Sequence, residues 1–486
     1  MSVGNSPRTA AWLLPEMIEG SGGHRTMLQN IDAMLGAGYH CDLYVQRPRG
    51  DERERDEASA TSGRQMREFF GFDPDRPGCR VFSGLQCEGE YDAVFATAWW
   101  TARVASNWHA KHKAYFVQDF ESYFNPMGDG YLMAENSYRL GLTPITIGRW
   151  LTQKLTREFE CTATWFEFCA DLSVYQRRAG RQRDRAVAFI CQPEKPRRCP
   201  RLGLEALSIV KRLRPDVEVR IYGSRDKTDL WFDAEQLGLV TVEQCADLYN
   251  SCQVGLCISS SNPSRIPFEM MACGLPVVDI HRENNLCDMP EGGVLLAEQR
   301  PDELARAIVM LIDDKARCDV MGSYGSRFMQ DRDLSVGFSQ FLGAVEDLLA
   351  GRLHEWRERA RTVEPFYSRP RRLPPAAAQL EIKPVPEGER ERASLAQAEF
   401  QAMMRASHEL AEIEGSRAWR VAMSLKDTPI YRAYASHRYG EGWREANAPA
   451  EQDPRLALDR VTRSRAYRLI RGIKGSGLYR WYRKSK

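Results

Sequence analysis

The sequence lacks a long hydrophobic run. A helix that spans a membrane needs about 20 apolar residues in a row, whereas the longest runs here, such as Ala186–Cys191, have the length of a β-strand. The apolar stretch Ala10–Leu14 is too short for the core of a signal peptide and is followed at once by Pro15 and Glu16. We therefore expect a cytoplasmic chain that neither crosses a bilayer nor is exported.

The sequence also lacks paired cysteines and an excess of charge. Its 13 cysteines are scattered from Cys41 to Cys318 without a C-x-x-C pair, which argues against a zinc site or a disulfide framework and predicts reduced thiols. No H-E-x-x-H motif occurs, and we expect no metal and no cofactor. Lys and Arg number 68 against 66 Asp and Glu, and a net charge of +2 gives no whole-chain field that would attract nucleic acid.

What the sequence does contain is an alternation of strand and helix patterns. Residues 9–45 are typical of a strand, a glycine-rich loop, a helix and a second strand, and such a β-α-β unit implies a parallel sheet. Residues 49–65 are charged and aperiodic, which predicts an exposed loop. Further elements of this first series are expected as strands at 93–96, 114–117 and 145–147 and as a helix at 150–159.

A second alternating series begins near residue 185. Its expected strands lie at 187–190, 217–221, 254–258 and 276–278, and its helices at 202–213, 243–250, 267–273, 302–312 and 336–349. We therefore predict an α/β protein with two Rossmann-like domains, residues 1–180 and 181–352, facing a ligand cleft at the carboxyl ends of their strands. Residues 353–395 predict a proline-rich linker, and residues 396–486 a helical, basic extension.

One stretch of the second series carries most of the chemical information. From Ser259 to Asp279 the sequence predicts a strand end, a loop and a helix that begins near Pro267. Backbone N–H groups and the positive end of the helix dipole then lie at the mouth of the cleft, where a diphosphate can bind. Glu269 falls in the first turn of this helix. An ordinary helix-dipole glutamate fits the spacing equally well.

The segment Pro267–Val278 resembles the donor-site motif of family 4 retaining glycosyltransferases, with Glu, Ala, Gly and Pro at the expected offsets. The resemblance implies a GT-B fold, retention at the anomeric carbon, and a role for Glu269 in binding the ribose hydroxyls of a nucleotide. The family pattern has a second glutamate eight residues earlier, where this chain has Ser261.

A narrower resemblance is to bacterial rhamnosyltransferases that build surface polysaccharides. It rests on Gly22–Thr26, Tyr115–Glu121, Thr146–Trp150, Pro196–Arg198 and Asn262–Asp279. Members of this subgroup tend to lack the first glutamate, so Ser261 fits it. The resemblance implies dTDP-rhamnose as donor and, as acceptor, a hydroxyl of a growing lipid-linked glycan at the inner face of the plasma membrane.

Two segments are candidates for contact with the diphosphate. Gly22 and Gly23 let a backbone approach a ligand closely, with Arg25 as a charge clamp; a tight βα turn is the alternative. Arg197 and Arg198 follow a strand in the loop where cations can neutralise a leaving diphosphate; solvated surface arginines are the alternative. The full donor-binding set that we predict is Gly22, Gly23, Arg25, Arg197, Arg198, Ser261, Asn262, Pro267 and Glu269.

Two carboxylates are candidates for handling the acceptor. Asp119 and Glu121 follow the strand 114–117, at the end expected to face the cleft, where a carboxylate can position or deprotonate a hydroxyl. Simple capping of the following segment is the alternative. Together with Arg197 and Arg198, they form the predicted catalytic set.

The last 27 residues, 460–486, hold ten Lys and Arg and no acid, interleaved with aromatic and aliphatic side chains. This composition suits an anionic membrane surface; RNA and the chain's own acidic surface are alternatives. For the whole chain we predict a peripheral glycosyltransferase of polysaccharide biosynthesis. The alternatives are a non-catalytic GT-B-like scaffold and a GT-B epimerase or sugar-phosphate transferase.

Overall fold

The computed structural model describes residues 7–367 except 49, 50, 52, 88, 179 and 194, together with 402, 406, 409, 410, 413, 424, 437, 454–464 and 467. The chain divides into two compact units, and residues 1–228 with 232–382 form the first of them. All elements from β1 to α13 belong to this unit. Among the described residues, no helix has the length and apolar character needed to cross a membrane.

The first domain is a parallel sheet of seven strands in the order β3-β2-β1-β4-β5-β6-β7. Its strands are β1 (Thr9–Leu14), β2 (His40–Val45), β3 (Cys79–Ser83), β4 (Tyr91–Ala96), β5 (Ala110–Val117), β6 (Thr143–Ile147) and β7 (Thr164–Phe166). Its helical segments are α1 (Gly22–Gly36), α2 (Arg55–Phe70), α3 (Trp99–Ala105), η1 (Glu121–Phe124), α4 (Asp129–Ser137) and α5 (Arg149–Phe159). A helical segment lies between each two successive strands except β3 and β4, because parallel neighbours require a crossover.

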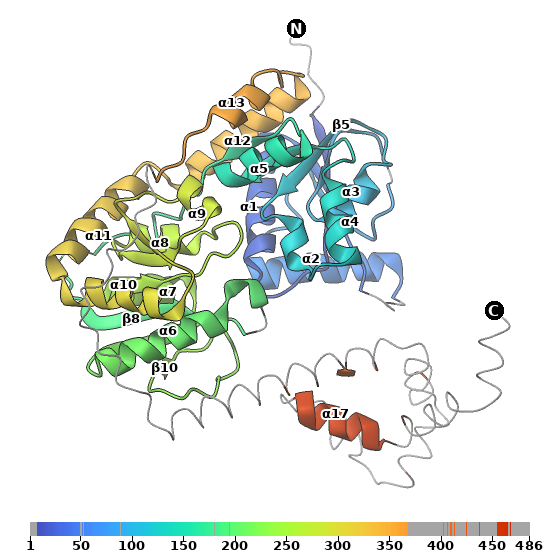
Figure 1. The fold of residues 1–486 in the computed structure, drawn as a ribbon. Coiled ribbons are helices and arrows are strands. Elements are labelled where there is room, and N and C mark those ends of the chain that lie inside the picture. The colour runs from blue at the N-terminus through green and yellow to red at the C-terminus, as the bar shows by residue number, and fades with distance from the viewer. Residues whose placement is uncertain are drawn as a thin grey trace. The chain divides into compact units, whose positions relative to one another are not determined.

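The second domain repeats this architecture around a parallel sheet of six strands in the order β10-β9-β8-β11-β12-β13. Its strands are β8 (Asp184–Ile190), β9 (Glu218–Tyr222), β10 (Glu235–Gln236), β11 (Cys252–Leu256), β12 (Val277–Ile280) and β13 (Val294–Ala297). Its helical segments are η2 (Pro196–Arg198), α6 (Pro200–Leu213), α7 (Val242–Ser251), α8 (Ile266–Ala272), α9 (Glu283–Asp288), α10 (Pro301–Asp313) and α11 (Lys315–Met329). The expected pair of Rossmann-like domains is confirmed (Figure 1).

After α11 the chain returns to the first domain. In α12 (Leu334–Leu349), the Phe341 ring packs 5.5 Å from that of Phe116 and 6.1 Å from that of Trp12. Helix α13 (Trp356–Thr362) contacts α5, as Figure 1 also shows. The expected end of the second domain at 352 and start of a linker at 353 are therefore wrong. An amphipathic pattern predicts a buried helix face, but it does not say which sheet that face covers.

The segment 49–65 was expected to be an exposed loop, but most of it is helical. Helix α2 begins at Arg55 and buries Ala58, Ser62 and Met66, which lie four residues apart on one face. Small and polar side chains make up most of this face, so the sequence shows no apolar period there.

In the extension predicted for 396–486, α17 (Pro454–Arg463) is helical. Most of the basic segment 460–486 lies outside the described residues.

Candidate functional site in the interdomain cleft

Asp119 joins the two domains at the carboxyl ends of their sheets. It follows β5, and its Oδ2 lies 2.8 Å from Nη1 of Arg197 in η2. Ser261 Oγ donates to the same oxygen at 2.8 Å, and the Asn262 N–H donates to Oδ1 at 2.9 Å. A carboxylate of the first domain is thus held by three groups of the second, and four of the predicted site residues lie in direct contact.

The hydrogen-bonding capacity of Asp119 is fully used. The Phe120 N–H provides a fourth donor, to Oδ1 at 2.8 Å, and a carboxylate offers about four acceptor positions. Asn262 Nδ2 in turn donates to the carbonyls of Gln118 and Ile147, both at 2.9 Å. The carboxylate therefore fixes the loop after β11 against the ends of β5 and β6, and in this arrangement it has no acceptor position left for a substrate proton.

Glu121 lies at the start of η1 and is buried. Its Oε2 accepts a hydrogen bond of 3.1 Å from the N–H of Trp99, the first residue of α3. Its own N–H donates to the Tyr138 hydroxyl at 2.8 Å. Burial raises the pKa of the Glu121 carboxyl group to about 8. Glu121 therefore caps a helix, as the alternative interpretation of this residue expected. The capped helix is α3 and not the segment that follows Glu121.

The loop with Arg197 and Arg198 is held in place. Ser260 Oγ donates to the Arg197 carbonyl at 2.6 Å, and the Arg197 guanidinium lies 4.5 Å from the centre of the Phe124 ring. Arg198 is half-buried, and its enclosed Nε has no hydrogen-bond partner. Burial lowers the pKa of Arg198 to about 10. An enclosed N–H without an acceptor favours the binding of an anionic oxygen.

Glu269 lies in α8 with cations around it. No described residue donates a hydrogen bond to its half-buried carboxylate, while Arg265 and Arg25 oppose the burial that raises its pKa to about 7. Arg265 also donates from Nη1 to Gln29 Oε1 in α1 at 2.6 Å, which links the domains. Arg25 is exposed in α1. The carboxylate thus keeps acceptor capacity for hydroxyl groups of a ligand.

The glycine-rich loop borders this region. A Cβ atom at Gly22 would contact nothing within 4 Å, and one at Gly23 would lie 3.6 Å from Gln118 Nε2. The backbone is therefore open to a ligand at Gly22. The Gly23 carbonyl accepts from Gln118 Nε2 at 3.2 Å, which ties α1 to the end of β5. Pro267, in contrast, is buried in the first turn of α8 and contributes to the helix start rather than to an open surface.

Sequence reasoning missed a cavity in the second domain. A cavity of about 160 Å³ lies at the carboxyl ends of β8 and β9, with Cys191, Tyr222, Arg225 and Lys227 in its lining. Arg225 also forms an ion pair of 2.5 Å with Glu19 of the first domain. The position of Arg225 directly after β9 was the available signal. Within the described part of the chain, no group of three or more His, Cys, Asp or Glu side chains is placed to hold a metal ion.

Sequence comparisons cover the second domain best. Residues 185–309 match the family described as WsaF, C-terminal domain. The chain is 35% identical over 218 residues to the O-antigen biosynthesis protein RfbC of Myxococcus xanthus. That similarity covers 43% of this chain and only 17% of RfbC.

Solved structures with low sequence identity share the architecture. HepE of Anabaena, in complex with UDP and glucose, is 14% identical with a TM-score of 0.50, and the match covers 69% of this chain and 99% of HepE. The protein TarM is 10% identical with a TM-score of 0.53, over 70% of this chain and 98% of TarM. These neighbours have the GT-B fold. The fold is GT-B. The predicted fold class is thereby confirmed, and the cleft just described is the one between its two domains.

Proposed function

We propose that the chain is a glycosyltransferase of polysaccharide biosynthesis that moves a sugar from a nucleotide diphosphate to a hydroxyl group. The observation that carries the proposal is that two residues with unused hydrogen-bonding capacity follow strands at the carboxyl end of the second sheet: Arg198 after β8 and Glu269 in the helix after β11. The name of RfbC and the UDP and glucose bound to HepE support it. We further propose dTDP-rhamnose as the donor, on the resemblance to rhamnosyltransferases.

In this proposal the second domain binds the donor. Glu269 accepts hydrogen bonds from the ribose hydroxyls, and Arg198 and Arg197 donate to the diphosphate. The open backbone at Gly22 and the exposed guanidinium of Arg25 contact the diphosphate from the first domain. As negative charge grows on the leaving diphosphate, the arginines stabilise the transition state more than the bound donor.

We propose that transfer proceeds with retention and without a metal ion or an enzymic nucleophile. Asp119 has no acceptor position left, and Glu121 is bound to α3. The acceptor oxygen forms its bond to the anomeric carbon on the face from which the phosphate oxygen leaves. The departing phosphate takes the acceptor proton. Asp119 is then a positioning residue that holds Arg197 and the loop of Ser261.

Ser261 stands where the family pattern has a glutamate. Its contact with Asp119 suggests how this site can do without a carboxylate at residue 261. Its hydroxyl donates to Asp119 Oδ2 at 2.8 Å. A carboxylate is therefore present beside residue 261, supplied by the first domain instead of by residue 261 itself. Serine leaves the space that this carboxylate and Arg197 occupy together.

For the acceptor side we propose a lipid-linked glycan. Of the ten large hydrophobic side chains that are exposed among the described residues, five lie between residues 124 and 140. We call Phe124, Met127, Leu132 and Met133 the apolar ledge; Met127 is 77% and Leu132 51% exposed. The ledge begins next to the site because the Phe124 ring lies against Arg197. The basic residues 460–486 would hold the protein at the inner face of the plasma membrane.

A panel of nucleotide sugars tests the donor assignment. A ligand at 100 times its dissociation constant stabilises the folded state by about 2.7 kcal/mol, so the true donor should raise the melting temperature above all others. We expect dTDP-rhamnose to do so in the full chain and in Glu205→Ala, a control on α6. We expect a clearly smaller rise in Glu269→Ala, because a tenfold loss of affinity leaves only about 1.4 kcal/mol of this stabilisation. A panel in which no nucleotide sugar stabilises the protein would contradict the proposal.

A further inference from the structure

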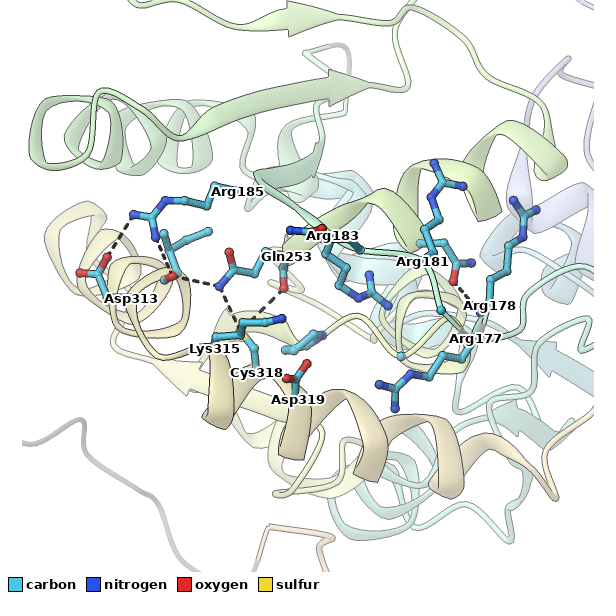
Figure 2. Close-up of a pocket in the computed structure, with 16 residues that line it drawn as sticks. Arg177, Arg178, Arg181, Arg183, Arg185, Gln253, Asp313, Lys315, Cys318 and Asp319 are labelled. Atoms are coloured by element: carbon cyan, nitrogen blue, oxygen red, sulfur yellow. Dashed lines mark hydrogen bonds and ion pairs between the residues drawn. The ribbon is translucent and has the colours of Figure 1, made fainter.

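A larger cavity, of about 600 Å³, lies at the opposite edge of the second sheet. Its lining includes Arg185 at the start of β8, Gln253 at the start of β11 and Pro276 just before β12. These are the amino ends of the strands, whereas the interdomain cleft lies at their carboxyl ends. The donor site assigned above therefore does not account for this cavity. We call it the basic pocket (Figure 2).

The basic pocket carries an excess of positive charge. The described residues that line it include six cationic side chains and two acidic ones. These side chains are Arg177, Arg178, Arg181, Arg183, Arg185 and Lys315, against Asp313 and Asp319. Arg178 pairs with Asp247, and Arg185 pairs with Asp216 and Asp313. The other four cations form no ion pair with any carboxylate in the described part of the chain.

Arg183 provides a half-buried, oriented charge in this pocket. Its guanidinium donates to the carbonyl oxygens of Tyr249 at 2.5 Å, Cys252 at 2.7 Å and Cys273 at 2.6 Å. Burial lowers the pKa of Arg183. Carbonyl groups fix the position of a guanidinium without neutralising it, so a bound anion would supply the missing negative charge.

Arg177 and Lys315 bring two further charges to the same space. Arg177 lies across the backbone of Gly274, where a Cβ would come within 2.9 Å of its Cδ, and donates from Nη1 to Ser323 Oγ at 2.7 Å. Lys315 begins α11. Figure 2 shows the ends of Arg177, Arg183 and Lys315 directed toward one space, with Asp319 beside it. Arg178 and Arg181 point away from this space.

We propose that the basic pocket binds a diphosphate or a similar multivalent phosphate group, as a second anion site separate from the donor cleft. Several cations around one space match several phosphate oxygens. The described residues of the lining include no aromatic ring on which a nucleobase would stack, which favours the phosphate group itself over a nucleotide base. The inference does not depend on the proposed glycosyltransferase activity. The phosphate can belong to a soluble diphosphate or to a lipid headgroup.

Calorimetric titration of the full chain with inorganic pyrophosphate at low ionic strength tests the site. Pyrophosphate can also enter the donor cleft, so the titration is repeated in Arg197→Ala/Arg198→Ala, where we expect the basic-pocket binding to remain. In Arg177→Glu/Lys315→Glu we expect the affinity of this site to fall at least tenfold. Arg64→Glu/Lys111→Glu makes the same charge change on exposed residues elsewhere and should bind as the parent does.

A gain-of-affinity variant guards against misfolding as an explanation. Asp319 is exposed beside the pocket and repels an anion, so Asp319→Asn should bind pyrophosphate more tightly than the parent. Equal affinity in the parent, Arg177→Glu/Lys315→Glu and Asp319→Asn would overturn the proposal.

Vesicle sedimentation distinguishes the two sources of phosphate. Vesicles of phosphatidylglycerol and phosphatidylcholine are mixed with the parent and with both charge-reversal variants. Weaker sedimentation of Arg177→Glu/Lys315→Glu than of Arg64→Glu/Lys111→Glu assigns the phosphate to a lipid headgroup. Equal sedimentation of the two, with pyrophosphate binding lost only in the first, assigns it to a soluble diphosphate.

Discussion

Nη1 of Arg197 lies 2.8 Å from Oδ2 of Asp119, and this ion pair crosses from one Rossmann-like domain to the other. The Asp119 side chain is 7% exposed and that of Arg197 26%. Removing one partner of such a poorly hydrated pair leaves the other charge without compensation, which costs more than the pair contributes when intact. The same contact fixes Arg197, which is proposed to face the diphosphate. The Asp119 carboxylate therefore holds the two domains together and also positions the cation that stabilises charge on the diphosphate.

Asp119→Asn should therefore affect both stability and turnover. We expect a loss of about 1–3 kcal/mol in the free energy of unfolding, because Arg197 loses its counter-charge and one hydrogen bond becomes a clash of donors. We also expect kcat to fall about tenfold or more while the donor KM changes less than threefold, since the arginine matters most in the transition state. Asp92→Asn, which breaks a pair with the exposed Lys111, is the control. A variant that loses stability but keeps kcat would reduce Asp119 to a purely structural role.

Arg197→Ala/Arg198→Ala should lose far more turnover than donor affinity. Both arginines are proposed to meet charge that grows as the diphosphate leaves. Steady-state kinetics together with donor titration separate the two effects. Turnover within threefold of the parent would show that this loop does not take part in the reaction. Arg201→Ala, a nearby arginine paired with Glu205, should leave both quantities unchanged.

Donor binding should depend on pH through Glu269. Burial raises the pKa of its carboxyl group to about 7, and only the ionised form offers both oxygens to ribose hydroxyls. Affinity should be highest above pH 7 and weaken toward about tenfold per pH unit below it. The stability of the ligand-free protein should change with pH in the opposite direction. An acid whose pKa is raised in the folded state loses its stabilising contribution as the pH rises through that pKa.

Titration of a nucleotide sugar between pH 5.5 and 8.5, roughly the range around this pKa, measures the dependence. Glu269→Gln should bind more weakly at pH 8 and show a flat profile. Glu269→Ala should weaken donor binding about tenfold or more, the loss expected for hydrogen bonds to a charged acceptor. The same pH profile in the parent and in Glu269→Gln would remove Glu269 from the donor site.

The apolar ledge predicts a variant that affects the acceptor alone. Met127→Ser/Leu132→Ser replaces two exposed side chains that no core contact requires, so the fold and donor affinity should be preserved. The KM for a lipid-linked acceptor should rise at least fivefold because apolar contact with the lipid is lost. A water-soluble acceptor with the same glycan should show no change. An equal effect on both acceptors would mean that the ledge contacts sugar or another part of the protein.

The basic segment 460–486 remains a prediction from the sequence. Lys and Arg near anionic headgroups contribute about 1 kcal/mol each, so the full chain should sediment with anionic vesicles, less at high salt. Deleting Arg460–Lys486 should abolish sedimentation and leave donor binding intact. Sedimentation that persists after the deletion would place membrane binding elsewhere.

The sequence predicted most of the fold because buried parallel strands leave local signals. The apolar runs at 114–117 and 187–190 became β5 and β8, and the helix with Glu269 starts within a residue of the predicted position. The predictions for α2 and for α12 were wrong because local sequence patterns do not show which surface a helix packs against. A helix face built from Ala58, Ser62 and Gly63 has no apolar period, and nothing local in α12 shows that Phe341 packs on the first sheet.

The site was predictable as a set of residues but not as a network. That Asp119 and Arg197 lie near the cleft follows from their positions after strands. That they bind each other, and that Ser261 completes the same carboxylate, depends on how two domains close, over a separation of 78 residues in the sequence. The free capacity of Glu269 and the enclosed Nε of Arg198 likewise follow only from the packed structure.

Release of nucleoside diphosphate tests the central claim most directly. The full chain is incubated with each nucleotide sugar and a lipid-linked glycan fraction, and free diphosphate and sugar incorporated into the lipid fraction are measured together. The proposed function predicts acceptor-dependent release matched mole for mole by incorporation, with one donor, highest for dTDP-rhamnose, and lost in Arg197→Ala/Arg198→Ala. A donor that binds the parent but yields neither diphosphate nor glycosylated lipid would contradict transfer and identify the cleft as a binding site only.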